Sequence, residues 1–234
     1  MFPLYDTIPA QRQPVVTWAI IGLNLLFFLY ELSLSSEEVQ ALFYQFGLVP
    51  ARYTRPAWAE ANGLAPNNYL PFLLNMFLHG GIAHFVGNMW TLWIFGDNVE
   101  DLMGRWRFAA FYLLTGLHLV FNSHSPIPSV GASGAISGVM GAYLFLFPRS
   151  RIVFLFPLLF LPIFIPIPAL LYLGGWFVVQ FVSGVSSTAQ ATAPTGGVAF
   201  WAHIGGFVGG LLLHKLFLQL NVRGETLPDI LGLN

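Results

Sequence analysis

The segment Val130-Gly-Ala-Ser-Gly-Ala-Ile-Ser-Gly-Val-Met-Gly-Ala-Tyr143 combines a glycine-flanked serine with an apolar run that is rich in small residues. Gly131 and Gly134, on either side of Ser133, allow a tight turn that brings the backbone close to a bound carbonyl group. Ser133 would then begin a helix, whose first N–H groups are free to bind an anionic oxygen. A serine in this place is also an ordinary helix cap, so the segment alone predicts either a nucleophile or a cap.

The composition of the whole chain is that of a membrane protein. Of its 234 residues, 56% are hydrophobic and only 8% are charged, whereas a soluble domain carries about 25% charged residues. The net charge is −1, whereas binding to nucleic acid requires an excess of basic residues, so no nucleic-acid partner is expected. The chain contains no cysteine, which excludes disulfides, thiolate catalysis and cysteine metal sites. Lipid is therefore expected to be part of the solvent.

Six apolar segments are predicted to cross the bilayer, because a spanning helix needs about 20 mainly apolar residues. Residues 1–14 lack the basic start and the cleavage site of a signal peptide, so the first apolar run is expected to be a retained span. The chain (1–234) is thus expected to fold as a single all-α domain, a polytopic bundle of six transmembrane helices. The predicted spans are 15–34, 84–95, 108–121, 133–147, 168–182 and 198–218.

The segments between the spans differ in character. Residues 35–69 mix charged and aromatic side chains, which is typical of the membrane interface, and form a large first loop. Three prolines in residues 152–167, with Pro168 directly after them, would break a helix, so the fifth span is predicted to start at Pro168. Residues 183–195 are small and polar and indicate a mobile loop.

The third span is short. Fourteen residues rise only about 21 Å as a helix, against a hydrocarbon core of about 30 Å. Either residues 122–130 continue the crossing in a less regular form, or the bilayer thins locally.

Charge distribution predicts the orientation. Six spans place both termini on one side of the membrane, together with most of the basic residues, whereas only Arg52 and Arg55 lie opposite. The positive-inside rule makes the side of the termini cytoplasmic. A prokaryotic plasma (inner) membrane is the simplest expectation for such a chain. The second, fourth and sixth spans then start at the outer face, so their polar residues share one depth. The basic residues on the cytoplasmic side are Arg12, Arg105, Arg107, Arg149, Arg151, Lys215 and Arg223.

His203 is the residue expected to act with Ser133. It precedes four glycines in the sixth span, and small residues at four-residue spacing let two helices approach closely in lipid. Such packing is also what a Ser–His contact of about 3 Å requires. All ten acidic residues lie in loops or at span ends, so the sequence predicts a Ser–His dyad with no third member and excludes aspartyl proteolysis.

His84 and Asn88 lie four residues apart on one face of the second span. Both can donate a hydrogen bond to developing negative charge. No HExxH or comparable cluster supports zinc, so neither a metal nor another cofactor is expected. His79 precedes the span beside two glycines and is expected to line the route by which water reaches the site.

These residues resemble the rhomboid intramembrane serine proteases, in their compact bacterial six-span form. The likeness rests on the segments 79–88, 130–143 and 202–206, which occur in the family's order. One departure concerns Ser137, because some members carry at this position an aromatic ring that stacks on the catalytic histidine. Either the histidine would be held less firmly here, or another ring, such as that of Trp201, would hold it.

The resemblance implies a role for each candidate residue. Ser133 would be the nucleophile and His203 the base, with His84, Asn88 and the Ser133 backbone N–H forming the oxyanion hole. His79 and Gly131 would support the site. Residues 183–195 would cap it, the fifth span would be a lateral gate for substrate, and the first loop would lie half-submerged.

The function expected from the sequence is that of an intramembrane serine endopeptidase. Its partners would be the lipid bilayer and single-span or polytopic membrane proteins, cleaved near the outer leaflet. A catalytically inactive relative that binds transmembrane helices is the main alternative. A small transporter is a further alternative, but the two halves of the chain share no internal repeat. The sequence indicates neither the natural substrate nor the oligomeric state.

Overall fold

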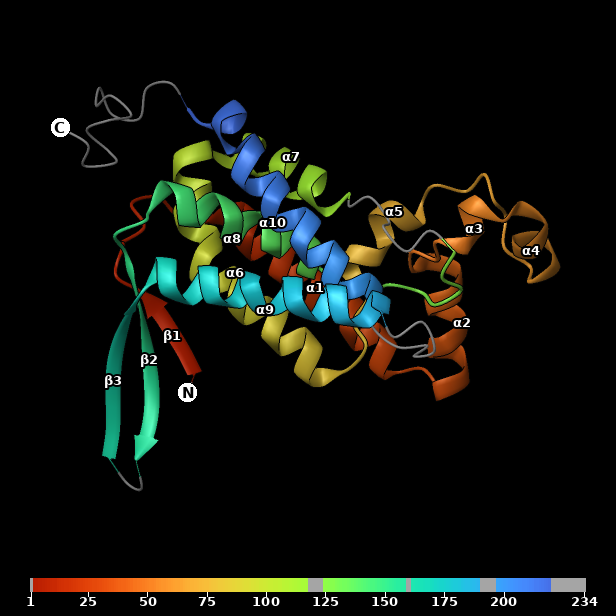
Figure 1. Cartoon of the computed structure of the whole chain (residues 1–234), viewed down its shortest axis with the longest axis horizontal. Helices are drawn as coiled ribbons and strands as arrows, with labels where there is room; N and C mark the ends of the chain where they lie inside the picture. Colours follow the sequence, from red (N-terminus) through yellow and green to blue (C-terminus); the bar gives the residue numbers. More distant parts are fainter. Residues whose placement is uncertain (1, 118–123, 159–160, 190–196, 220–234) are drawn as a thin grey trace.

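A computed structural model describes residues 2–117, 124–158, 161–189 and 197–219 of the chain. Its main body is a bundle of helices in which α8 packs against four others, while α1 packs against α6 (Figure 1). Buried aromatic side chains such as Phe95, Phe111 and Tyr143 fill the space around α8. The helices of the bundle are α1 (Val15–Leu32), α6 (Ile82–Met103), α7 (Arg105–Gly116), α8 (Ser133–Leu146), α9 (Ala169–Ala189) and α10 (Gly197–Phe217).

Two helices in the described part of the chain are long and apolar enough to cross a membrane on their own composition. They are α1 and the segment Ala169–Ser187 of α9, and the apolar helix α8 is shorter. Each of the six predicted spans overlaps a helix of the bundle, but the six-span arrangement in a bilayer stays a prediction. The third of them, α7, has 12 residues. Residues 118–123 lie outside the described residues. From residue 124 to α8 the chain is a loop, and Ser129 of this loop pairs with Leu48 of the first loop.

Helix α6 is longer than the sequence suggested. Its predicted end near residue 95 is wrong, since the helix continues to Met103. The reason is a tertiary contact: the buried carboxylate of Glu100 accepts hydrogen bonds from the backbone N–H groups of Val16 and Thr17, at 2.9 and 2.8 Å. The Thr17 hydroxyl donates a third bond at 2.8 Å. Glu100, a charged residue that in the sequence suggests that the helix has already ended, therefore lies inside α6 and caps the free N–H groups of α1.

The all-α expectation is wrong for residues 151–168, which form an antiparallel hairpin. Strand β2 (Arg151–Leu158) pairs with β3 (Leu161–Pro168) and also with the N-terminal strand β1 (Phe2–Asp6), in the order β1-β2-β3. The prolines exclude a helix, as expected, and three of them, Pro162, Pro166 and Pro168, fit β3 because an edge strand needs no hydrogen bonds on its outer side. The hairpin projects from one end of the bundle (Figure 1).

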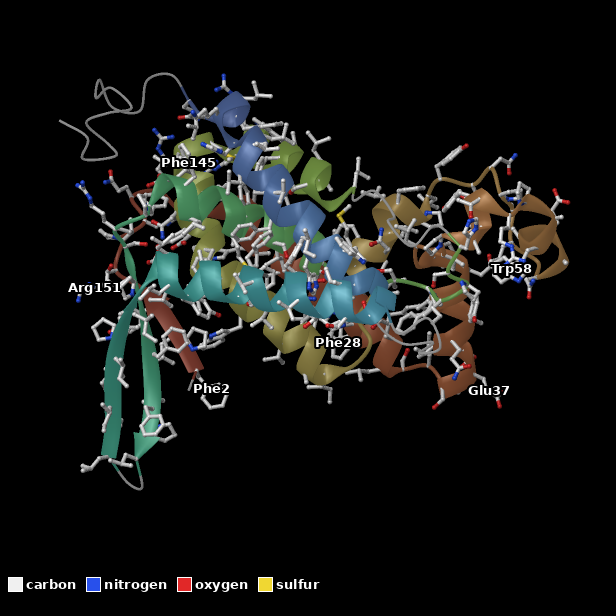
Figure 2. The ribbon with its side chains drawn as sticks, in the orientation of Figure 1. Phe2, Phe28, Glu37, Trp58, Phe145 and Arg151 are labelled. Atoms are coloured by element: carbon white, nitrogen blue, oxygen red, sulfur yellow. The ribbon has the colours of Figure 1, made fainter. Side chains whose placement is uncertain are left out.

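The first loop occupies the opposite end of the molecule. Figure 2 shows Glu37 and Trp58 at this end, far from Phe2 and Arg151. Its centre is the buried Arg52, whose guanidinium donates to the backbone oxygens of Gln45 and Ala65 at 2.9 Å each. The short helices of this region are α2 (Ser36–Phe46), α3 (Ala51–Thr54), α4 (Pro56–Ala61), α5 (Pro71–Leu74) and the 3-10 helix η1 (Asn75–Phe77).

The loop predicted over residues 183–195 is wrong for its first seven residues. Helix α9 continues to Ala189, so residues 183–189 are helical rather than a loop. Residues 190–196, which complete the predicted cap, lie outside the described residues.

Candidate active site

Ser133 and His203 meet across two helices. Ser133 is the first residue of α8, and its Oγ lies 2.7 Å from Nε2 of His203 in α10. Both side chains are half-buried, so they are shielded from water and still reachable. A hydroxyl within hydrogen-bond distance of an imidazole nitrogen is the arrangement that activates a serine nucleophile.

The two helices approach closely enough for this contact because glycines of α10 lie directly against the backbone of α8. A Cβ added to Gly206 of α10 would lie 2.0 Å from the carbonyl oxygen of Gly134 in α8. A Cβ added to Gly210 would lie 1.9 Å from the oxygen of Gly138. No larger residue fits either position without separating the helices. The glycine-rich pattern therefore serves helix packing and the Ser–His contact together, as the sequence suggested.

The turn before α8 brings the nucleophile to α6. Gly131 has φ 127°, a conformation that side chains other than glycine rarely adopt. Its N–H donates to the oxygen of Asn75 at 2.8 Å, and a Cβ here would lie 2.7 Å from Cε1 of His84. A substitution at Gly131 would therefore strain the backbone and also displace His84.

The candidate oxyanion donors line the same cavity as the dyad. A cavity of about 260 Å³ is bordered by His84 and Asn88 of α6, together with Ser133 and His203. Nδ1 of His84 accepts from the Gly80 N–H at 3.3 Å, which places the ring proton on Nε2. The Nδ2 group of Asn88 is buried and has no hydrogen-bond partner among the described residues. Both side chains thus offer an N–H group for a ligand in the cavity.

His79 packs beside His84, and its role in admitting water stays a prediction. It is 2% exposed, its ring centroid is 5.3 Å from that of His84, and it does not line the cavity. Its backbone N–H donates to both carboxylate oxygens of the buried Glu31 in α1, at 3.0 and 3.2 Å. In the described part of the chain, neither ring nitrogen of His79 has a hydrogen-bond partner.

Helix α9 supplies two contacts to His203 that the sequence did not indicate. Oε1 of Gln180 lies 2.8 Å from Nδ1 of His203. The ring of Trp176 packs beside the imidazole, with centroids 5.8 Å apart and planes at 37°. Trp176 is therefore a ring that packs against the imidazole, whereas the role suggested for Trp201 stays a prediction. One signal was available, because Gln180 is an amide in the middle of an apolar span, and such residues are usually paired or functional.

The remaining histidines lie away from the dyad. The His214 ring is buried in the last turns of α10, and its Nδ1–H donates to the oxygen of Leu211 at 2.8 Å. His124 lies in the loop before α8, and His118 is outside the described residues. Within the described ranges, no three His, Asp or Glu side chains gather as a metal ion would require.

Comparison with known proteins gives the family. The Rhomboid domain model matches residues 66–220. The chain is 37% identical over 147 residues to rhomboid protease GluP of Bacillus subtilis, which covers 61% of this chain and 27% of the relative. It is 32% identical over 146 residues to the mitochondrial rhomboid protein 1 of Saccharomyces cerevisiae, covering 58% of this chain and 38% of the relative. The human mitochondrial presenilin-associated rhomboid-like protein is 35% identical over 101 residues, with 40% and 26% covered.

The relatives therefore match over only about a quarter to two fifths of their own length. They come from a bacterium and from mitochondria, so the expectation of a prokaryotic plasma membrane is not supported. The family model, in contrast, spans about two thirds of this chain and includes Ser133, His203 and the cavity between them. The chain belongs to the rhomboid family of membrane proteins.

Proposed function

We propose that this chain is an intramembrane serine endopeptidase that hydrolyses peptide bonds in the transmembrane segments of membrane proteins. The observation that carries the proposal is the 2.7 Å contact between Ser133 Oγ and His203 Nε2, at the wall of a cavity. Membership of the rhomboid family and the similarity to a relative named as a protease support it further.

The chemistry begins with the dyad. Nε2 of His203 accepts the proton of the Ser133 hydroxyl as Oγ attacks the scissile carbonyl carbon. The protonated imidazole then donates this proton to the leaving amine, and the C–N bond breaks. Water adds to the acyl-enzyme with His203 again acting as base, which releases the new carboxyl end and restores Ser133.

The negative charge of the tetrahedral intermediate falls on the former carbonyl oxygen. Three N–H groups would bind it: Nε2–H of His84, the amide of Asn88, and the backbone N–H of Ser133 at the start of α8. A partly enclosed cavity strengthens such interactions, since little water competes for them.

The proposed topology gives the substrate its position. If the six helices cross the bilayer with both termini cytoplasmic, the dyad lies in the outer half of the membrane. A substrate helix must unwind there before its backbone can reach Ser133. Small or helix-breaking residues near the cleaved bond lower that cost, because they favour the helix least.

Cleavage of a reconstituted substrate tests the proposal. The purified protein is incorporated into liposomes with a single-span protein whose transmembrane segment contains glycine, and the products are identified by mass spectrometry. Wild-type protein should cut within or beside the transmembrane segment, and Ser133→Ala should not cut. Ser137→Ala is the matched control, because the Ser137 hydroxyl already donates to the backbone carbonyl oxygen of Ser133 at 2.6 Å. Cleavage by Ser133→Ala at the wild-type rate would refute the proposal.

A further inference from the structure

We infer that Gln180 is a positioning residue that completes a Ser–His–Gln relay by holding the imidazole of His203 in the productive tautomer. The inference rests on the proposed function. It assigns the third member of the site to a neutral amide on α9, where the sequence offered no acid.

The two contacts of the imidazole carry the inference. Oε1 of Gln180 is 2.8 Å from Nδ1, and Oγ of Ser133 is 2.7 Å from Nε2. A carbonyl oxygen can only accept a hydrogen bond, so the proton of the neutral ring lies on Nδ1. The lone pair then lies on Nε2, facing the serine hydroxyl, which is the tautomer that a general base needs.

Gln180 lies on the buried face of α9. The side chain is 9% exposed, although its helical neighbours Val178 and Val179 are 58% and 59% exposed. Trp176 lies one turn earlier on the same face of α9 and packs beside the imidazole. His203 is thus held by a ring contact and a hydrogen bond from a single helix.

A neutral amide suits this environment better than a carboxylate would. Burying a charge costs far more than burying an amide that has a hydrogen-bond partner. Among the described residues that border the cavity there is no carboxylate, and the titratable side chains are His84, Tyr172 and His203. Gln180 therefore orients the base without adding charge, whereas a carboxylate would also stabilise the protonated imidazole.

The acceptor belongs to a helix that contains neither reacting residue. Ser133 lies on α8 and His203 on α10, and Gln180 reaches them from α9. The alignment of the base therefore depends on where α9 lies relative to α10. A displacement of α9 that breaks the amide contact would free the imidazole to take either tautomer.

Two variants and one control test the inference. Gln180→Met keeps the length of the side chain and removes the acceptor, whereas Gln180→Glu keeps the acceptor and adds a charge. Val179→Met alters the neighbouring, outward-facing position of α9 and serves as the control. Each protein, in full length and in detergent micelles, is treated with a soluble fluorophosphonate. The rate of labelling is followed across pH, since this probe needs no transmembrane substrate.

Gln180→Met should lower the labelling rate roughly tenfold, the factor that corresponds to one neutral hydrogen bond. Gln180→Glu should recover most of this rate at alkaline pH. Its acid limb should move to higher pH, because the carboxylate stabilises the protonated imidazole. A purely structural role would leave the pH profile in place. The inference is overturned if Gln180→Met labels at the wild-type rate and the Gln180→Glu profile is unshifted.

A second measurement separates this inference from the proposed function. Nitrogen-15 NMR of histidine-labelled protein, with the His203 signal assigned from His203→Ala, reports the tautomer without any reaction. Wild type should carry the proton on Nδ1, and Gln180→Met should populate both tautomers. If wild type takes no label but shows this change, the proposed function fails and the positioning contact stands. If the tautomer is the same in both proteins, the positioning role is refuted.

Discussion

Gly206 of α10 faces the carbonyl oxygen of Gly134 in α8 so closely that a single added methyl group would lie 2.0 Å from that oxygen. This contact lies between the first turn of α8, which begins at Ser133, and the turn of α10 that follows His203. The spacing of the two helices at the dyad is therefore set by the absence of a side chain.

Gly206→Ala should separate α8 from α10 at the active site. Displacing a reacting group by about 1 Å can cost about 10² in rate, so cleavage is expected to fall by that factor. Overpacking should also lower the free energy of unfolding by about 1–3 kcal/mol. Proteolysis in liposomes and thermal unfolding in detergent measure the two effects.

Gly209→Ala is the matched control, because a Cβ at this position of the same helix meets nothing within 4 Å. It should keep wild-type cleavage and unfold at an equal or higher temperature, since alanine favours a helix over glycine. Equal losses in the two variants would mean that helix packing at Gly206 does not position the dyad.

Asn88→Ala should slow the chemical step without weakening substrate binding. The buried Nδ2 of Asn88 has no hydrogen-bond partner among the described residues, so its N–H is available to the oxyanion. Loss of one such donor costs about 10² to 10³ in kcat, with little change in KM. Steady-state kinetics on a fluorogenic transmembrane peptide would show this split.

Thr91→Val provides the comparison for Asn88→Ala. Thr91 borders the same cavity one turn later in α6, but its hydroxyl donates to the oxygen of Gly87 at 2.7 Å. Its kcat should stay within a few-fold of wild type, because a committed hydroxyl contributes little. A raised KM with normal kcat in Asn88→Ala would assign Asn88 to substrate binding.

Glu100→Gln should weaken the attachment of α1 to α6. Its carboxylate accepts from two backbone N–H groups in the first turn of α1, and the amide would lose the charge that favours them. The free energy of unfolding is expected to fall by about 1.5–3 kcal/mol. Thermal unfolding in detergent should show the loss, and the exposed Glu60→Gln should leave the melting temperature unchanged. A wild-type melting temperature in Glu100→Gln would show that the charge of Glu100 does not stabilise the contact between α1 and α6.

The N-terminal strand should be held more tightly at acid pH. Burial raises the pKa of Asp6 from 3.8 to about 6, although the Tyr143 hydroxyl partly offsets the shift. Because the folded state holds this proton more tightly than the unfolded state, the contribution of Asp6 to the free energy of unfolding is greatest below pH 4. This contribution decreases as the pH rises to about 6 and is constant above that.

Hydrogen exchange of the β1 amides between pH 4 and pH 7 tests this behaviour, with protection factors corrected for the intrinsic rate. Asp6→Asn cannot ionise at this position and should remove the trend. Protection that increases with pH in wild type, or an equal slope in Asp6→Asn, would show that Asp6 does not control the docking of β1.

The pairing of Ser133 with His203 could be predicted from the sequence because its signals are local. The glycines around Ser133 and after His203 indicate close helix packing, and a membrane leaves few roles for polar groups at shared depth. The start of each predicted span lies within a few residues of the corresponding helix, since apolar length decides where a helix can cross.

What could not be predicted depends on contacts between distant segments. The prolines of residues 152–167 excluded a helix, but the pairing of β2 with both β1 and β3 depends on partners far apart in the sequence. The end of α6 was missed because Glu100 is satisfied by α1. Gln180 and Trp176 were missed because the amide of Gln180 marks a buried face of α9, but the sequence does not show which residue of another helix that face meets.

The most direct test of the central claim is to identify the residue that a fluorophosphonate modifies. Wild-type protein in detergent is treated with the probe, digested and sequenced by mass spectrometry, beside Ser133→Ala and His203→Ala. The wild type should carry one adduct, on Ser133, and neither variant should carry any. An unlabelled wild type would instead support a catalytically inactive relative that binds transmembrane helices. An adduct on another serine, or undiminished labelling of Ser133 in His203→Ala, would contradict the Ser133–His203 dyad.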